Sequence, residues 1–333
     1  MFKVLFLLWG AIIIYSCESS KFEENDLNIS SSIQKELLFN RESQYIVVFG
    51  DIQEYTKNEK TILLFANSLN WIKEKQDTFK NILCVLHVGD VTWNNLKSQW
   101  NYFSKYAAPF SEYIPFITVI GNHDYTYNNN LIESRSSTLI SKYADFPSLE
   151  EKIVARFDET IDNIIIQNTI GNKRYDIIAL EFGPRKEVIE WTKKYVQDHP
   201  TIKYILLTHE WLTRDGDRIF SGSYAEKLLR NTTFSTPEYI WNTLVYPNDN
   251  IVCTVCGHNG FSKVLYSANI KGRDVPQILF NLQYFKNGGN GLVELWEFSP
   301  NSDYANIFIV DTKTNTLYHE ENLLNSFMFK YKY

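Results

Sequence analysis

The segment PFITVIGNHD, residues 115–124, holds the pattern on which the fold assignment rests. A continuous apolar run of this length between turn-forming residues is typical of a buried β-strand. The run ends in an oxygen donor, an imidazole and a carboxylate, contributed by Asn122, His123 and Asp124 behind Gly121. One such motif is weak evidence by itself, so its weight depends on how the other strands end.

Four other apolar runs also end in a polar residue, which follows a glycine in three of them and Thr208 in the fourth. YIVVFGD and ILCVLHVGD end at Asp51 and Asp90, and IKYILLTH and IVCTVCGH end at His209 and His258. In open α/β sheets, ligands bind at the carboxyl ends of the strands. A glycine before the polar residue lets the backbone turn tightly and approach a metal. We therefore expect one metal centre formed by Asp51, Asp90, Asn122, His209 and His258. Their oxygen and imidazole donors suit Mn, Zn or Fe.

Helical patterns lie between these strands, and more strand candidates follow them. Apolar residues recur at helical spacing in 61–75, and two further segments, 99–110 and 187–197, also indicate helices. Consecutive strands with few helices are expected late in the chain, at 277–283, 291–298 and 307–310. This order predicts an α/β domain in which two packed sheets are flanked by helices.

The middle of the chain gives a weaker pattern. Residues 127–170 are polar and irregular, and we expect short helices near 136–143 and 148–155. A strand is expected at 175–182. Cys253 and Cys256 lie three apart on a predicted buried strand, where their side chains point to opposite faces. We expect them to pack as small apolar residues rather than to form a disulfide or a metal site.

Composition narrows the class of protein. The chain has 333 residues, a net charge of −6 and a pI near 5.6. This charge balance argues against a nucleic-acid-binding protein that uses a broad basic face. Aromatic residues make up 15% of the chain, so many of them must form core or cleft wall. We expect a monomer.

The N-terminus has the pattern of an export signal. Lys3 is followed by an apolar run over 4–14, which is shorter than the ~20 residues that a membrane-spanning helix needs. The run leads to Cys17, and this end resembles the bacterial lipobox, whose cysteine carries the lipid. The alternative is a plain secretory signal with an incidental cysteine. We expect a signal peptide over 1–17, a flexible tether over 18–42 and export to the periplasmic or outer side of a bacterial membrane.

Taken in order, the strand-end motifs resemble the motif series of the calcineurin-like metallophosphoesterases. The resemblance runs from about residue 45 to 260 and rests on Gly50-Asp51-Ile52-Gln53, Gly89-Asp90, Gly121-Asn122-His123-Asp124, His209 and Gly257-His258. It implies a four-layer α/β/β/α sandwich over 43–325 with two metal ions at the strand ends, of which we expect this chain to hold one or two. It also implies hydrolysis of phosphomonoesters or phosphodiesters by metal-activated water.

The resemblance assigns a role to each matching residue. Asp90 would bridge two metals, and Asn122, His209 and His258 would complete one site with it. Asp51 and Gln53 would serve the other site. His123, oriented by Asp124, would stabilise the transition state or protonate the leaving oxygen.

Two positions depart from the family pattern, and both belong to the Asp51 site. Gln53 and Gly260 stand where the family carries histidines. The amide of Gln53 offers a carbonyl oxygen, whereas Gly260 offers no side chain. The sequence therefore predicts one well-specified metal site and one doubtful site.

Other residues are expected to shape a pocket for a phosphorylated small molecule or polymer. Arg214 is a candidate for holding a phosphate oxygen by its forked guanidinium, although a solvated loop arginine is an equal alternative. Asn94 and Tyr125 follow the second and third motifs and are further candidates. A competing hypothesis is a catalytically impaired scaffold that binds ligands at the cell surface. The loss of both histidines favours it, and the intact His123-Asp124 pair counts against it.

Overall fold

The first sheet carries three of the predicted strand ends. The computed structural model describes residues 37, 39–230 and 232–333. Its first sheet runs in the order β16-β15-β14-β1-β2-β3, with β17 paired to β15. β1, β2 and β3 are parallel, and β14 runs antiparallel to β1. The strands are β1 (Gln44–Phe49), β2 (Ile82–His87), β3 (Phe116–Thr118), β14 (Leu292–Phe298), β15 (Tyr304–Asp311), β16 (Thr316–Leu317) and β17 (Ser326–Lys330).

The second sheet carries the remaining predicted strand ends. It runs in the order β12-β13-β11-β10-β9-β7-β6, and β8 pairs with β9. β9, β10, β11 and β13 are parallel, whereas β12, β7 and β6 are antiparallel to their neighbours. The strands are β6 (Ile153–Arg156), β7 (Ile164–Ile166), β8 (Thr169–Ile170), β9 (Lys173–Ala179), β10 (Lys203–Leu207), β11 (Ile251–Cys256), β12 (Phe261–Ala268) and β13 (Asp274–Asn281).

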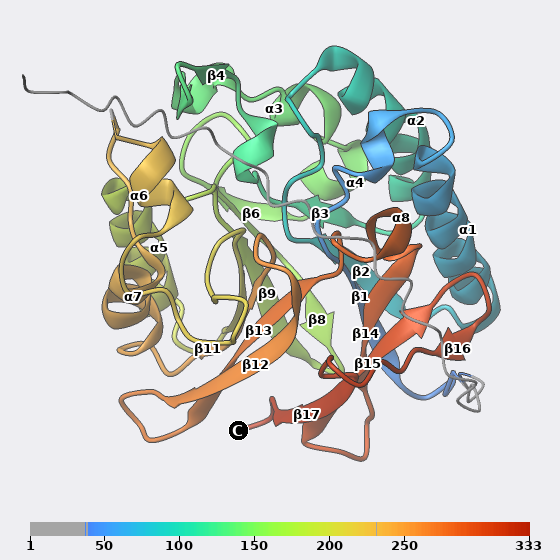
Figure 1. Cartoon of the computed structure of the whole chain (residues 1–333). Coiled ribbons are helices and arrows are strands. Elements are labelled where there is room, and N and C mark those ends of the chain that lie inside the picture. Colours follow the sequence, from blue (N-terminus) through green and yellow to red (C-terminus); the bar gives the residue numbers. More distant parts are fainter. Residues whose placement is uncertain (1–36, 38, 231) are drawn as a thin grey trace, which may run out of the picture. The chain divides into compact units, whose positions relative to one another are not determined.

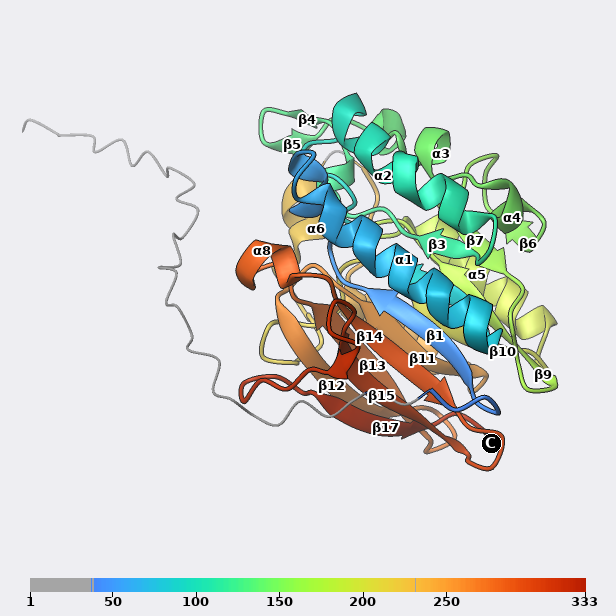
Figure 2. The same cartoon turned by 90° about the vertical axis from the view of Figure 1, so that its right-hand side faces the viewer.

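Helices cover the outer faces of both sheets. α1 (Ile62–Phe79) and α2 (Lys97–Ser111) lie over the first sheet (Figure 2), and α5 (Lys186–Asp198) and α7 (Pro237–Ile240) flank the second (Figure 1). The expected four-layer α/β/β/α arrangement is confirmed. Shorter elements complete the fold: α3 (Ile140–Tyr143), α4 (Pro147–Glu150), α6 (Tyr224–Leu228), α8 (Lys286–Gly289), a π-helical turn (Trp241–Val245), a hairpin of β4 (Tyr127–Asn128) and β5 (Leu131–Ile132), and 3-10 turns at Tyr55–Lys57, Asn122–Asp124 and Arg135–Ser137.

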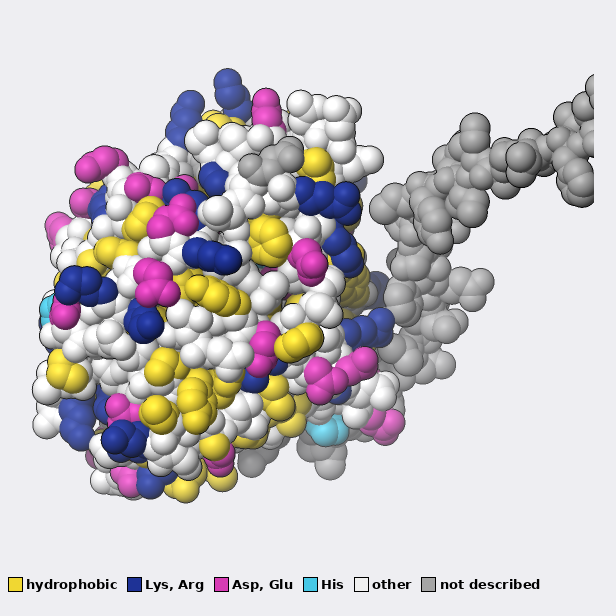
Figure 3. Space-filling view, turned by 90° about the vertical axis from the view of Figure 1, so that its left-hand side faces the viewer, with side chains coloured by type: hydrophobic (Ala, Val, Ile, Leu, Met, Phe, Trp, Pro, Cys, Tyr) yellow, Lys and Arg dark blue, Asp and Glu magenta, His cyan; other side chains and the backbone are white. Residues whose placement is uncertain are grey.

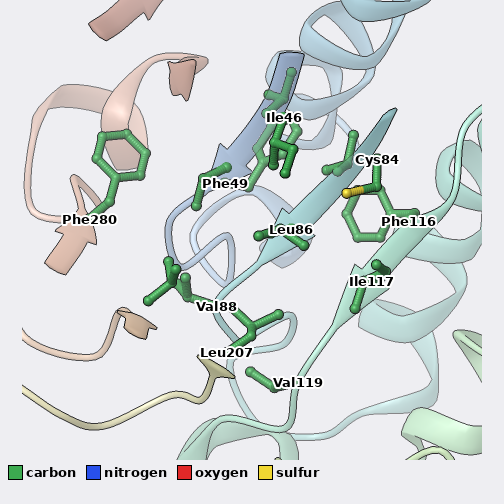
Figure 4. Packing of buried hydrophobic residues seen from close by; sticks show 14 of the residues in the cluster. Ile46, Phe49, Cys84, Leu86, Val88, Phe116, Ile117, Val119, Leu207 and Phe280 are labelled. Atoms are coloured by element: carbon green, nitrogen blue, oxygen red, sulfur yellow. The ribbon is translucent and has the colours of Figure 1, made fainter. Parts of the chain in front are cut away.

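The main core contains buried side chains of both sheets together with α1 and α2. Ile46 and Phe49 of β1, Leu86 of β2 and Phe280 of β13 belong to one cluster (Figure 4). The ring of Phe49 lies 5.4 Å from that of Phe65 on α1, which couples this helix to the sheet. Burial of side chains of this size contributes about 1.5–3 kcal/mol each. The apolar strands are therefore the rigid support on which the strand ends rest.

A second cluster packs α5 and α7 against the other face of the second sheet. Cys253 belongs to the first cluster and Cys256 to the second, so the two side chains do point to opposite faces of β11. Both thiols are free and buried. The expectation that they pack as apolar residues is confirmed.

One expected helix is wrong over most of its length. α4 ends at Glu150, and β6 (Ile153–Arg156) then pairs antiparallel with β7 (Ile164–Ile166). The predicted helix over 148–155 therefore fails beyond residue 150. The β-branched residues of this segment pair with an isoleucine run, and this tertiary pairing outweighs the local helical pattern.

The ends of the folded domain extend past the expected boundaries. The ring of Phe39 lies 4.6 Å from that of Tyr45, so the chain packs on the domain before residue 43. At the other end, β17 continues the first sheet beyond residue 325. The predicted signal peptide, Cys17 and most of the tether lie outside the described residues.

The surface shows mixed charge where it is in view. Lys and Arg side chains are intermingled with Asp and Glu on the face that carries α5, α6 and α7 (Figure 3). Within the described part of the chain, no helix is both long and apolar enough to cross a membrane.

Candidate metal centre

The predicted ligands meet because the parallel strands of both sheets end at the same edge. Asp51, Asp90 and Asn122 follow β1, β2 and β3, whereas His209 and His258 follow β10 and β11. All five side chains are buried. The structure places Asp90, His209 and His258 as a group whose ligand atoms lie within 4.8 Å of one another.

The spacing of these atoms fits one metal ion. Nε2 of His209 lies 3.1 Å from Oδ1 of Asn122, 3.2 Å from Nδ1 of His258 and 3.4 Å from Oδ1 of Asp90. Ligand atoms at ~2.1 Å from a tetrahedral ion lie ~3.4 Å apart. The three separations measured from Nε2 of His209 are therefore close to the value that a shared ion requires.

Hydrogen bonds fix the orientation of His209. Its Nδ1 lies 2.8 Å from the carbonyl oxygen of Val88 and donates to it. This contact leaves the Nε2 lone pair for the centre, as is usual for metal-binding histidines. Burial opposes protonation of His209, but the carboxylates of Asp90 and Asp51 outweigh it and raise the pKa to about 10. These carboxylates thus favour a positive charge at this point of the site.

His258 stays neutral in this environment. Burial, together with the charge on His209, lowers the pKa of His258 to about 3. Neutral imidazole is the form that binds metals. Its Nδ1 faces Nε2 of His209, and the ring of Tyr224 packs edge-on against it at 4.5 Å between centroids.

Asp90 is held in a strained backbone conformation. Its φ of 56° and the φ of 64° at His258 lie in the left-handed region, which costs about 1–3 kcal/mol for residues other than glycine. Its Oδ1 accepts the backbone N–H of His123 at 2.9 Å, and its Oδ2 accepts Nε2 of Gln53 at 3.2 Å. Burial raises the pKa of Asp90, but the charges of His209 and His123 more than offset this and hold it below its ordinary value.

The expected contact between Asp124 and His123 is wrong. Nδ1 of His123 lies 2.8 Å from the carbonyl oxygen of Trp93, so this carbonyl orients the ring. The carboxylate of Asp124 points elsewhere and accepts the backbone N–H groups of Gly121, Val91 and Thr92, plus the Thr92 hydroxyl. Burial and the nearby charge of Asp90 nevertheless raise the pKa of Asp124 to about 6. Asp124 ties loops together, and Nε2 of His123 is the nitrogen left for chemistry.

Two amide side chains that the sequence analysis missed surround Asp51. Nδ2 of Asn281 donates to Oδ2 of Asp51 at 2.7 Å, and Nε2 of Gln283 donates to the same oxygen at 3.1 Å. Oδ1 of Asp51 accepts the backbone N–H of His258 at 3.1 Å. Asn281 ends β13 and Gln283 lies two residues beyond it, so both reach the centre because β13 runs parallel to β11.

The positions of the missing histidines have distinct surroundings. Among the described residues, Oε1 of Gln53 is buried and has no hydrogen-bond partner. Gly260 has the ring of Tyr284 beside it, so that a Cβ at Gly260 would overlap this ring. The Asp51 half of the centre therefore lacks imidazole ligands and has amides instead.

The three residues predicted to bind substrate differ in their exposure. Tyr125 is fully buried and offers no surface to a substrate, so this assignment is wrong. Its neighbour Tyr127 is partly exposed and donates its hydroxyl to the carbonyl oxygen of Asn122 at 3.2 Å. Asn94 is exposed on the loop after β2. Arg214 is also exposed, and its guanidinium lies 4.1 Å from the ring centroid of Phe261. The roles of Asn94 and Arg214 stay predictions.

Comparison with known proteins identifies one family and several distant relatives. A family model, calcineurin-like phosphoesterase, matches residues 45–260. "Uncharacterized protein YvnB" of Bacillus subtilis is 23% identical over 302 residues, which cover 85% of this chain and 21% of that protein. "Probable inactive purple acid phosphatase 27" of Arabidopsis thaliana is 30% identical over 90 residues, which cover 24% of this chain and 14% of that protein. The chain thus spans about a fifth or less of the length of these relatives.

A solved structure shares the fold. The purple acid phosphatase PPD1 from yellow lupin (Lupinus luteus) seeds superposes with a TM-score of 0.51 at 16% sequence identity. The match covers 87% of this chain and 54% of that chain.

Proposed function

The chain belongs to the calcineurin-like phosphoesterase family, and we propose from this that it is a metal-dependent hydrolase of phosphomonoesters or phosphodiesters. The observation that carries the proposal is the set of three donor atoms within 3.4 Å of Nε2 of His209. Held by Asp90, Asn122, His209 and His258, a Mn, Zn or Fe ion would lower the pKa of water and neutralise charge on phosphoryl oxygens.

The chain's own residues supply orientation and a proton. Nδ1 of His123 is hydrogen-bonded to the carbonyl oxygen of Trp93. Nε2 of His123 is therefore the nitrogen that can donate a proton to the leaving oxygen. The water oxygen bonds to phosphorus as the bond from phosphorus to the leaving oxygen breaks. The proton that water loses replaces the one that His123 gives, so the products are a phosphate and an alcohol.

The test uses the full-length protein with an aryl phosphate and a bis-aryl phosphate, with Mn, Zn or Fe added. We expect His123→Ala to lower the rate by about 10²–10⁴-fold, the usual contribution of a positioned proton donor. Asp90→Asn should abolish both metal binding and turnover. The control is His319→Ala, which removes an exposed histidine outside the centre.

Two outcomes would contradict the proposal. The first is the absence of turnover with every metal and both substrates in wild-type protein. The second is wild-type turnover in either Asp90→Asn or His123→Ala, which would show that the residue roles are wrong. Circular dichroism of each variant separates loss of chemistry from loss of fold.

A second candidate function is a surface protein that binds phosphorylated ligands without hydrolysing them. It is favoured by Gln53 and Gly260 at the two histidine positions, and by a relative whose name calls it inactive. Under this candidate, a bis-aryl phosphate binds in calorimetry with the metal present, but no product forms.

We also propose that the protein acts outside the cytoplasm on a lipid anchor at Cys17. The support is the apolar run over 4–14 and the cysteine behind it. Wild-type protein should incorporate labelled palmitate and stay with membranes, whereas Cys17→Ala should do neither. Labelling of the variant at the wild-type level would contradict the anchor.

A further inference from the structure

We infer that this centre holds one metal ion per chain, because the amides of Gln53, Asn281 and Gln283 take the place of a second ion. The consequence is a preference for phosphodiesters over phosphomonoesters. The inference rests on the proposed function, since it needs the ion at Asp90, Asn122, His209 and His258.

The orientation of the Asn281 amide is fixed by its neighbours. Its Oδ1 accepts the backbone N–H of Gln283 at 3.0 Å, which leaves Nδ2 toward Asp51. Nδ2 lies 2.7 Å from Oδ2 of Asp51 and 3.1 Å from the carbonyl oxygen of His258. Both of these neighbours are acceptors, so only an NH₂ group satisfies them. Asn281 therefore presents protons, and not an oxygen ligand, to the Asp51 side of the centre.

The same reasoning applies to Gln283. Its Nε2 lies 3.1 Å from Oδ2 of Asp51 and also faces the carbonyl oxygen of His258. Together with the backbone N–H of His258 on Oδ1, three donors occupy the carboxylate of Asp51. An ionised carboxylate has about four lone-pair positions. One position is left, so Asp51 offers at most one bond to a metal.

The third amide faces the carboxylate that would bridge two ions. Nε2 of Gln53 donates to Oδ2 of Asp90, while Oδ1 of Asp90 faces His209. The oxygen of Asp90 that would turn toward a second ion is thus already hydrogen-bonded. Three neutral NH₂ groups therefore meet the two carboxylates on the side where a second cation would lie.

The last coordination position on this side has no side chain. Residue 260 is a glycine and therefore offers no side-chain ligand to a second ion. A structural metal site has four protein ligands, and a catalytic zinc site has three with a water in the fourth position. The described residues around Asp51 offer one lone pair of Asp51, one of Oδ2 of Asp90 and Oε1 of Gln53, which is fewer than four donors and includes no imidazole.

The charge of the centre then decides which substrate suits it. When Asp51 and Asp90 are both ionised, their charges and that of one divalent ion sum to zero, whereas two divalent ions would give a charge of +2. A phosphomonoester is largely dianionic at neutral pH and gains most from a positive centre. A phosphodiester carries one negative charge and loses less when the second ion is missing. The centre is therefore suited to diesters.

The first experiment measures metal content. Full-length wild-type protein is saturated with Mn²⁺, freed of excess ion by gel filtration and analysed by mass spectrometry. We expect one equivalent per chain. Two equivalents would overturn the inference and leave the proposed function standing, whereas zero equivalents of Mn²⁺, and of Zn²⁺ and Fe²⁺ in parallel loadings, would overturn both.

A gain-of-site variant tests the role of the amides. Asn281→Asp has the same shape, and its Oδ1 still accepts from Gln283, but it replaces the NH₂ group with an oxygen ligand. We expect its Mn²⁺ content to rise from one to two equivalents. The matched control is Asn301→Asp on an exposed turn, which should stay at one equivalent. A second variant, Gln53→Glu, makes the same change beside Asp90 and serves if the first fails to fold.

Substrate preference is measured on the same proteins. We expect wild-type kcat/KM to be higher for a bis-aryl phosphate than for the aryl monophosphate, and the ratio to fall about tenfold or more in Asn281→Asp. One equivalent of Mn²⁺ in both Asn281→Asp and Gln53→Glu would contradict the role of the amides. A monoester preference in one-ion wild-type protein would overturn the assignment of the substrate class.

Discussion

Substituting Gly121 by alanine tests how closely the ligand turn must approach Asp90. Gly121 has φ −95° and ψ 174°, a conformation that any residue adopts. An alanine is therefore opposed only by lack of space. Its Cβ would overlap Oδ1 and the backbone nitrogen of Asp90. Non-bonded atoms need about 3.5 Å, so the Asp90 carboxylate must move by more than about 1 Å.

The size of the effect follows from that displacement. A shift of about 1 Å in a catalytic group can cost about 10²-fold in rate, which corresponds to about 2.7 kcal/mol. We expect kcat/KM of Gly121→Ala for an aryl phosphodiester to fall by this factor, and its Mn²⁺ content to fall below that of wild type. The overpacking should also lower the free energy of unfolding by about 1–3 kcal/mol.

The matched control is Gly260→Ala. The Cβ at residue 260 would meet the ring of Tyr284, whose exposed fraction is 69%, so the ring can swing into solvent. This variant should keep a rate within about twofold of wild type. Wild-type rate and metal content in Gly121→Ala would refute the reasoning. Equal losses in both variants would show that the glycines act through folding rather than through Asp90.

Two further predictions concern the core. Burial raises the pKa of Glu294 on β14 to about 8, so between pH 4.5 and 8 the folded chain keeps a proton that the unfolded chain has lost. The contribution of Glu294 to the free energy of unfolding should therefore fall with rising pH by about 1.4 kcal/mol per unit in this window. In urea titrations at several pH values, Glu294→Gln should remove this dependence of the free energy of unfolding on pH. The control is Glu190→Gln on the exposed side of α5. Equal pH dependence in wild type and Glu294→Gln would contradict the prediction. In the Cys17→Ala variant, a thiol reagent should modify the three buried cysteines, Cys84, Cys253 and Cys256, only after unfolding. Rapid labelling of this variant in the folded state would contradict their burial.

Much of the centre could be predicted because it depends on local pattern and one topological rule. An apolar run marks a buried strand, and a polar residue behind it marks the strand end. Parallel strands then bring such ends to one edge. These facts are enough to place Asp90, Asn122, His209 and His258 together, and the structure gathers them around one point.

Side-chain direction could not be predicted in this way. His123 and Asp124 are neighbours in the chain, but the turn directs the imidazole to Trp93 and the carboxylate to Gly121 and the loop after β2. Tyr125 likewise turns into the core, whereas Tyr127 reaches the surface. Residue order on a tight turn does not determine which side chains meet.

The direction of a strand within its sheet is the second property that the sequence does not determine. The strand over 277–283 was expected, but the sequence does not tell whether it runs parallel or antiparallel to β11. β12 carries the chain back, so that β13 pairs parallel with β11. Its carboxyl end therefore reaches the centre with Asn281 and Gln283. An antiparallel strand would have placed both amides at the opposite end of the sheet.

The contacts of Asp124 show how the Gly-Asn-His-Asp turn acts as a unit. Its carboxylate accepts N–H groups from Val91 and Thr92 behind Asp90, and from Gly121 in front of Asn122. Hydrogen bonds to a charged group contribute about 1.5–3 kcal/mol each, so together they outweigh the about 1–3 kcal/mol of strain at the positive φ of Asp90. The loops after β2 and β3 are thereby locked to each other. Asp124 thus sets the separation of Asp90 from Asn122, although its side chain contacts neither the ion site nor the imidazole of His123.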